Sequence, residues 1–443
     1  MKIKELAIKT SAALILIIIA LVPFHAFLTV WGNSLIGHYT LLRLWKEYLL
    51  AICFILTLYI FFTDKKIREI FYYSRLVQLI IVFFVIELAW GVIAKDHHNV
   101  STKALFYGWL SDTRYLIFFL ITLIIAKKVS LLKNKSIKLI LWPATVVILF
   151  GLLEVFVLPR NFLTHFGYGP HTIMPYQTIN SNKHYVRILS TLRGSDPLGA
   201  YLLIPLSLAA VLLIRKRKVW QNIIFLIGGA IVMFFSFSRS AWLGLAVALA
   251  LSVYWGLKSK VIKRRLLYIA VVLAVVLVGG FIAERNNTRI QNIVFHTQNN
   301  SAVATTSDQN HLTALKDSFK QLATEPLGKG PGTAGPASVY NKDLPARIPE
   351  NYYLQIGLET GWLGMLVFLA INILVAFSLW VRRRDALSLA LLTSFIGLFI
   401  CNMLLESWTD DTLSYLWWGL AGIAIAVQPR SYKTSEKKSF WII

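Results

Sequence analysis

Long apolar runs alternate with short polar connections along most of the chain. A helix needs about 20 residues to cross a hydrocarbon core of about 30 Å, and about twelve of these runs are long enough to do so. They lie near residues 7–30, 42–63, 70–94, 105–126, 138–158, 197–214, 219–236, 240–257, 265–283, 352–380, 386–405 and 412–428. The pattern predicts an all-α polytopic membrane protein with about 12 transmembrane helices, in which residues 1–443 form a single integral membrane domain.

Two polar segments interrupt this alternation, residues 159–196 and the longer stretch 284–350. Ser307 in the second segment favours the start of a helix. After it, apolar residues recur at spacings of three and four, which predicts a short helix in the loop. These apolar residues are Leu312, Leu315, Phe319 and Leu322.

Composition supports a membrane protein, because 57% of the residues are hydrophobic against roughly 45 to 50% in soluble domains. Lys and Arg gather in every second connection and in the segment after the last run, so we expect both termini to be cytoplasmic and the two polar segments to lie outside. The net charge of +24 is therefore mostly an orientation signal. Because the basic residues are scattered over short turns, we expect no nucleic-acid binding.

Two further observations narrow the chemistry. Cys53 and Cys401 both fall within apolar runs, so neither a disulfide framework nor a metal cluster is expected. The first run, 7–30, is longer than a secretory signal core and has no small-residue cleavage site after it, which indicates a retained span.

Four arginines near the outer ends of the spans are candidates for binding a diphosphate. Arg239 lies in a turn so short that its side chain must stay at the membrane boundary, and Arg187 and Arg193 lie in a basic stretch without acidic residues. Arg289 follows the run 265–283. Guanidinium groups match phosphate oxygens. The structural alternatives are snorkelling for Arg239 and simple solvation for the others.

Two residues of the long outer segment are candidates for proton transfer. His311 lies on the apolar face of the expected helix, where a packing role is the alternative. Glu350 precedes the span that begins near Asn351, so its carboxylate could accept a proton from an acceptor hydroxyl or simply complement the helix dipole. Between them, Gly328 to Gly335 form a glycine-rich stretch that suits either close approach to an anion or a plain connector.

Other ionisable residues near the outer ends are assigned no chemistry. Asp112 and Arg114 are expected to form a pair that orders the helix ends, and Glu154 and Glu406 are expected to act in the same way.

Taken together, four motifs resemble the O-antigen ligase and polymerase family, in the family's order, over about residues 187–380. They are Leu192-Arg193-Gly194 with Pro197-Leu198-Gly199-Ala200-Tyr201-Leu202, Phe237-Ser238-Arg239-Ser240-Ala241-Trp242-Leu243, Pro326-Leu327-Gly328-Lys329-Gly330-Pro331-Gly332, and Glu350-Asn351-Tyr352-Tyr353-Leu354-Gln355 through Glu359-Thr360-Gly361-Trp362-Leu363-Gly364.

This resemblance implies a metal-independent glycosyltransferase of the C-type membrane architecture, without a cofactor, in the cytoplasmic (inner) membrane. It would transfer a glycan from undecaprenyl diphosphate to a glycolipid or glycan acceptor at the outer face, by inverting displacement. Arg239 would contact the donor diphosphate, supported by Arg193 and by Arg187.

The chain departs from the family's pattern at two positions. His311 stands where family ligases commonly have an arginine on the loop helix, and Glu350 stands where lipid A core ligases commonly have a histidine. The motifs are shared by ligases and polymerases, so both remain open. A lipid-linked oligosaccharide flippase or another secondary transporter is the alternative class, and Glu87, deep in the run 70–94, is its best feature.

Overall fold

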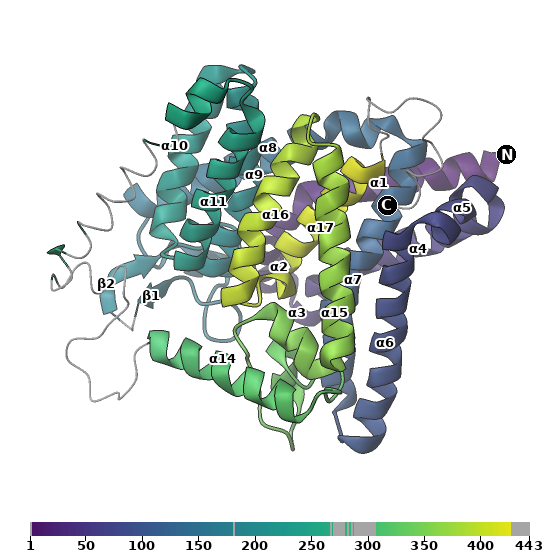
Figure 1. Cartoon of the computed structure of the whole chain (residues 1–443). Coiled ribbons are helices and arrows are strands. Elements are labelled where there is room, and N and C mark those ends of the chain that lie inside the picture. The colour runs from purple at the N-terminus through teal and green to yellow at the C-terminus, as the bar shows by residue number, and fades with distance from the viewer. Residues whose placement is uncertain are drawn as a thin grey trace.

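The computed structural model describes residues 2–179, 182–265 and 307–426, together with positions 268, 280, 283, 284 and 287. Nearly all of this is helical (Figure 1). The long helices are α1 (Lys2–Leu21), continued by η1 (Val22–Phe24) and α2 (His25–Ile36), α4 (Trp45–Thr63), α6 (Arg75–His97), α7 (Thr102–Lys128), α8 (Ser130–Phe156), α9 (Ser195–Ile214), α10 (Val219–Phe235), α11 (Arg239–Gly256), α15 (Tyr352–Val381), α16 (Ala386–Leu404) and α17 (Asp411–Ala426).

Eight helices of the described residues are long and apolar enough to cross a membrane. Every predicted span apart from 265–283 falls on a described helix, which confirms the all-α membrane class. The count of about 12 stays a prediction. Residues 265–283 lie outside the described residues, apart from a few isolated positions.

Short elements lie between the long helices. They are α3 (Tyr39–Arg43), α5 (Lys65–Tyr73), η2 (Phe162–Phe166), the antiparallel strands β1 (Gln177–Ile179) and β2 (Asn182–Arg187), α14 (Ser307–Thr324), η4 (Gly335–Tyr340) and η5 (Ser407–Thr409). α14 is the helix expected in the long outer segment. It lies crosswise to the bundle at the lower end in Figure 1, the end where β1 and β2 also lie. We call this end the loop end.

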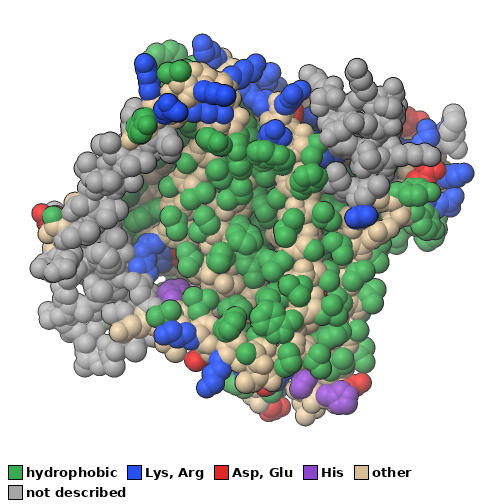
Figure 2. All heavy atoms as spheres, viewed as in Figure 1, with side chains coloured by type: hydrophobic (Ala, Val, Ile, Leu, Met, Phe, Trp, Pro, Cys, Tyr) green, Lys and Arg blue, Asp and Glu red, His purple; other side chains and the backbone are tan. Residues whose placement is uncertain are grey.

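The opposite end of the bundle is basic. There the Arg215 guanidinium donates to the carbonyl of Arg383 (3.4 Å), and Lys133 pairs with Asp385 (3.6 Å), so the start of α8, the connection after α9 and the connection after α15 meet. Figure 2 shows Lys and Arg gathered along the upper edge of one face, hydrophobic side chains over its middle, and mixed acidic, basic and histidine side chains along its lower edge. This distribution is the one expected of a protein that exposes its apolar belt to lipid.

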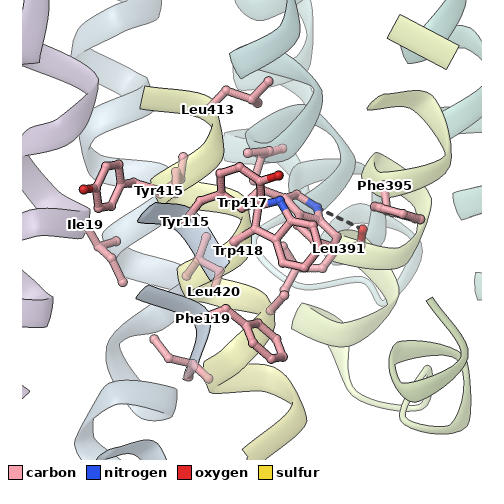
Figure 3. Packing of buried hydrophobic residues seen from close by; sticks show 14 of the residues in the cluster. Ile19, Tyr115, Phe119, Leu391, Phe395, Leu413, Tyr415, Trp417, Trp418 and Leu420 are labelled. Atoms are coloured by element: carbon pink, nitrogen blue, oxygen red, sulfur yellow. Dashed lines mark hydrogen bonds between the residues drawn. The ribbon is translucent and has the colours of Figure 1, made fainter. Parts of the chain in front are cut away.

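The core lies where α17 packs along α7 and where α16 packs along α9 and α11. α9 is buried along almost its whole length. Aromatic side chains from α7 and α17, among them Tyr115, Trp417 and Trp418, fill the centre (Figure 3). Trp417 donates its indole N–H to the carbonyl of Leu391 on α16 (3.3 Å), so a polar atom in this apolar region is satisfied.

Candidate active site

The turn between α10 and α11, which carries Arg239, is held by Arg187 at the end of β2. The Nε of Arg187 donates to the carbonyl of Ser236 (3.0 Å), and its Nη2 pairs with Asp196 Oδ1 (2.7 Å). Gly199 lies against the same turn, since a Cβ at this position would come within 2.7 Å of a side chain of α11. The structure therefore brings Arg187 and the Pro-Leu-Gly motif to the turn from which α11 starts at Arg239.

Arg193 makes a different contact. Its Nε pairs with Asp410 Oδ2 (2.9 Å), and its side chain is 42% exposed while that of Asp410 is 5% exposed. Asp410 lies in the connection between α16 and α17, so this connection holds Arg193 by an ion pair. Arg289 lies outside the described residues. The binding of a diphosphate by these arginines stays a prediction.

His311 and Glu350 are in direct contact, through Nδ1 of the imidazole and Oε2 of the carboxylate. Both side chains are partly exposed, at 34% and 29%. His311 is in the first turns of α14, and Glu350 immediately precedes Asn351, the residue that caps α15 by accepting from the Leu354 N–H (2.9 Å). Asn351 therefore caps the helix, and the Glu350 carboxylate contacts the imidazole.

The backbone at Glu350 is fixed by a second carboxyl. Glu350 has a φ of 52°, in the left-handed region, and its N–H donates to Glu406 Oε1 (2.7 Å). The amide of Asn351 donates to the carbonyl of Met403 (3.0 Å). Burial raises the pKa of Glu406 to about 7. Glu406 therefore positions the Glu350 backbone.

The connection between α16 and α17 joins the two groups of candidate residues. Glu406 contacts Glu350 at one point, and Asp410 pairs with Arg193 at another. From the sequence, Glu406 was expected only to order helix ends, and Asp410 was not identified as a candidate. The available signal was the presence of several acidic residues in a short gap between two apolar helices.

The backbone N–H groups of the glycine-rich stretch bind a carboxyl group, but this group belongs to the chain itself. Glu359 Oε1 accepts from the N–H of Gly332 (2.7 Å) and of Ala334 (3.3 Å). The N–H of Gly330 donates to the Glu359 carbonyl (2.6 Å). These backbone groups are therefore occupied, and the stretch is a loop fixed to α15 rather than an open anion cradle or a plain connector.

A break in α15 makes these contacts possible. Gly361 has a φ of 68° and a ψ of −173°, so the helical hydrogen bonding is interrupted there. The freed carbonyl of Leu358 accepts from the Lys329 N–H (2.9 Å), and the Trp362 N–H donates to the carbonyl of Pro326 (3.0 Å). The motifs around Gly328 and Gly361 are thus two sides of one interface.

A group of buried carboxyls lies next to this loop, toward the interior of the bundle. Asp112 accepts from the Tyr352 hydroxyl (2.9 Å), and that hydroxyl lies 2.8 Å from the Tyr115 hydroxyl. Glu87 and Glu359 interact electrostatically with Asp112. Glu87, the residue that favoured a transporter, therefore faces α7 and α15 inside the protein.

The expected pair of Asp112 and Arg114 is not the main contact of either residue. Arg114 pairs with Asp411 and with Glu47 (3.4 Å to Oε1). Lys46 joins this network through Asp411 Oδ2 (2.8 Å). Neighbouring positions on a helix face different directions, so Asp112 and Arg114 serve different clusters. Sequence reasoning missed the second cluster, because its members come from helices far apart in the chain.

Among the described residues, no group of three or more His, Cys, Asp or Glu side chains is arranged to hold a metal ion. Glu154 accepts from the Ser190 N–H (2.7 Å), which fixes the segment before α9 to the end of α8, in keeping with its expected ordering role.

Comparison with known proteins bears on this geometry. No curated protein matches the chain significantly. A protein-family model described as O-antigen ligase matches residues 223–369. The matched stretch includes the turn with Arg239, α14 with His311, the glycine-rich loop and Glu350. This match confirms the resemblance for the three motifs that lie within residues 223–369, a stretch that is similar to the O-antigen ligase domain.

Proposed function

We propose that the protein transfers a glycan from undecaprenyl diphosphate to a hydroxyl of a glycolipid or glycan acceptor, at the outer face of the cytoplasmic membrane and without a metal ion. The observation that carries the proposal is the contact between His311 and Glu350 within the O-antigen ligase domain. Each residue is a candidate for proton transfer on its own, and together they form a base with an orienting partner.

In the proposed reaction, the acceptor oxygen attacks the anomeric carbon on the face opposite the diphosphate. The bond from this carbon to the diphosphate oxygen breaks, its electron pair leaves with undecaprenyl diphosphate, and the configuration inverts. Glu350 holds the imidazole of His311 through Nδ1, so the other ring nitrogen takes the proton of the acceptor hydroxyl. The carboxylate then stabilises the imidazolium.

The arginines supply the opposite charge to the leaving group. A guanidinium has five N–H donors, so a contact with one carboxylate leaves donors for phosphate oxygens. Asp196 holds Arg187, and Asp410 holds Arg193. With Arg239, these residues would stabilise the charge that grows on the diphosphate, an effect that costs no reorganisation when the groups are already in place. Arg289 is proposed to join them.

The test is transfer by the purified protein in liposomes, supplied with undecaprenyl-diphosphate glycan and envelope extract in the presence of a chelator. We expect glycosylated product and released undecaprenyl diphosphate. Removal of an oxyanion-type donor or of a general base typically costs about 10² to 10⁴ in rate. We therefore expect losses of that order for Arg239→Ala and Glu350→Gln.

The matched control is Arg384→Ala, an exposed arginine in the connection between α15 and α16 at the basic end, which should retain full transfer. The size of the product distinguishes a ligase, which adds one glycan to a different acceptor, from a polymerase, which extends the glycan. Intact donor that crosses the bilayer without transfer would contradict the proposal and indicate a flippase.

A further inference from the structure

A cavity of about 280 Å³ lies at the loop end, between the end of α8 with the segment after it, strand β2, and the turn between α10 and α11. Ligand pockets in proteins usually measure about 300 to 1,000 Å³. At just under this range, the cavity has room for a small group, on the scale of one sugar unit. Neither His311 nor Glu350 lines it.

The lining combines aromatic rings with a few charged groups. Phe162, Tyr176, Tyr185 and Phe237 contribute rings. Flat apolar rings pack against the C–H faces of a sugar, whereas charged groups and phenol hydroxyls bind its hydroxyls. A site for an acyl chain would have no use for the charged groups. The chemistry of the lining therefore fits a saccharide.

The ionisable groups of the lining include Glu154 and Arg187, each held in place by the protein. Glu154 accepts from the Ser190 N–H (2.7 Å). Arg187 is fixed between Asp196 Oδ1 (2.7 Å) and the Ser236 carbonyl (3.0 Å). Because these contacts exist before any ligand binds, the entropic cost of ordering the polar groups on binding is small.

The cavity adjoins the proposed site of the diphosphate. The Ile188 N–H donates to the carbonyl of Phe235 (3.2 Å), so the end of β2 is attached to the turn before α11. Phe237 of this turn lines the cavity, and Arg239 follows two residues later at the start of α11. Arg187 is shared, since it lines the cavity and is also a candidate ligand of the diphosphate.

We propose that this cavity binds a sugar unit of the lipid-linked glycan next to its diphosphate, with Tyr176 and Tyr185 as positioning residues for the sugar ring. The inference rests on the proposed function, because it takes the diphosphate to lie at Arg187 and Arg239. It adds a recognition site for the donor sugar, with lining residues other than His311 and Glu350.

The test compares binding of two kinds of probe to the protein in nanodiscs. The probes are farnesyl diphosphate, and farnesyl diphosphate carrying a single glucose, galactose or N-acetylglucosamine. We expect at least one sugar-bearing probe to bind the wild type more tightly than farnesyl diphosphate. We expect the difference to be up to about tenfold in affinity, which corresponds to about 1.4 kcal/mol. Tyr185→Ala should lower the affinity for that probe by up to about tenfold and leave that for farnesyl diphosphate unchanged.

Two further variants make the result specific. Tyr185→Trp keeps a ring and should retain the gain from the sugar. Tyr73→Ala removes a tyrosine that is 62% exposed on α5, far from the cavity lining, and should change nothing. Equal affinity of the wild type for all probes would overturn the sugar site and leave the diphosphate proposal intact. Binding of no probe at all would overturn the diphosphate donor and the sugar site with it.

Discussion

At the scale of single residues, the contact between His311 and Glu350 explains two departures from the family's pattern at once. Where family ligases commonly have an arginine on the loop helix, this chain has His311, and where lipid A core ligases commonly have a histidine, it has Glu350. The two side chains are in contact, so both departures from the family's pattern affect the same pair of residues. The sequence identified both residues but not their pairing, because no periodicity relates α14 to the start of α15.

A double-mutant cycle tests whether the two residues act as a unit. His311→Gln and Glu350→Gln should each lower the transfer rate, by about 10² to 10⁴. The double variant should be little worse than the more impaired single variant, because residues of one catalytic unit are not additive. The non-additivity is measured by comparing the transfer rates of the three variants and the wild type at saturating donor. His171→Gln, which changes an exposed histidine of the other outer segment, should retain full activity. Additive losses would show two independent roles.

The buried carboxyl of Glu406 should make the stability of the protein depend on pH. Burial raises the pKa of Glu406 to about 7 in the folded protein, from its ordinary value of 4.5. A raised carboxyl pKa means that the folded state binds the proton more tightly. The associated stability is present below about pH 4.5 and is lost as the pH rises through about 7. Glu406→Gln, which stays neutral, should therefore unfold at a higher temperature than the wild type at pH 8, and the difference should shrink at pH 5. A constant difference across this range would contradict the assignment.

At the scale of elements, apolar spacing predicted where the helices lie, but it did not predict which of their side chains are buried. The spacing of Leu312, Leu315, Phe319 and Leu322 predicted the helix that the structure shows as α14. Of these residues, Leu322 is fully buried, whereas Leu312 and Phe319 are 52% and 57% exposed. Spacing reports which side chains share a face, and it does not report whether protein or lipid covers that face.

The break in α15 could not be predicted from the sequence, since one glycine within an apolar run is compatible with a continuous helix. What requires the break is the loop after α14, whose backbone N–H groups bind Leu358 and Glu359. The partners of that interface are separated by several turns and a loop in the chain. Local propensity therefore carries no information about it.

Gly361→Ala should weaken this interface. Its φ of 68° strains a residue with a Cβ, and an added Cβ would lie 2.4 Å from the carbonyl oxygen of Pro326. We expect a loss of about 1 to 3 kcal/mol in stability, together with reduced transfer, because Glu350 precedes the same helix. Thermal unfolding in detergent measures the loss. Gly169→Ala is the control, since its added Cβ would meet nothing within 4 Å and its φ is unstrained. Equal stability of the two variants would show that the break in α15 accepts a residue with a Cβ at position 361.

At the scale of the whole molecule, charge is divided between the surface and the interior. Basic connections meet at one end, where Asp64 pairs with Lys128 (2.6 Å) and Lys4 (2.9 Å) and so joins α1, α4 and α7. The sequence predicted this end from Lys and Arg counts alone. It did not predict the buried cluster of Lys46, Arg114 and Asp411, because charges inside a membrane domain are satisfied by partners that only the tertiary fold brings together.

The orientation of the bundle follows from the same division and can be tested directly. If the basic end is cytoplasmic, α14 lies outside. The native Cys53 and Cys401 are buried, so an introduced cysteine can be labelled against a low background. In intact cells, a membrane-impermeant maleimide should label Lys320→Cys, an exposed position of α14, and should not label Arg384→Cys, an exposed position at the basic end. After lysis, both should react. The reverse pattern in intact cells would place His311 and Glu350 in the cytoplasm and overturn transfer at the outer face. Labelling at the expected end would instead place the His311 and Glu350 pair where an acceptor outside the membrane can reach it.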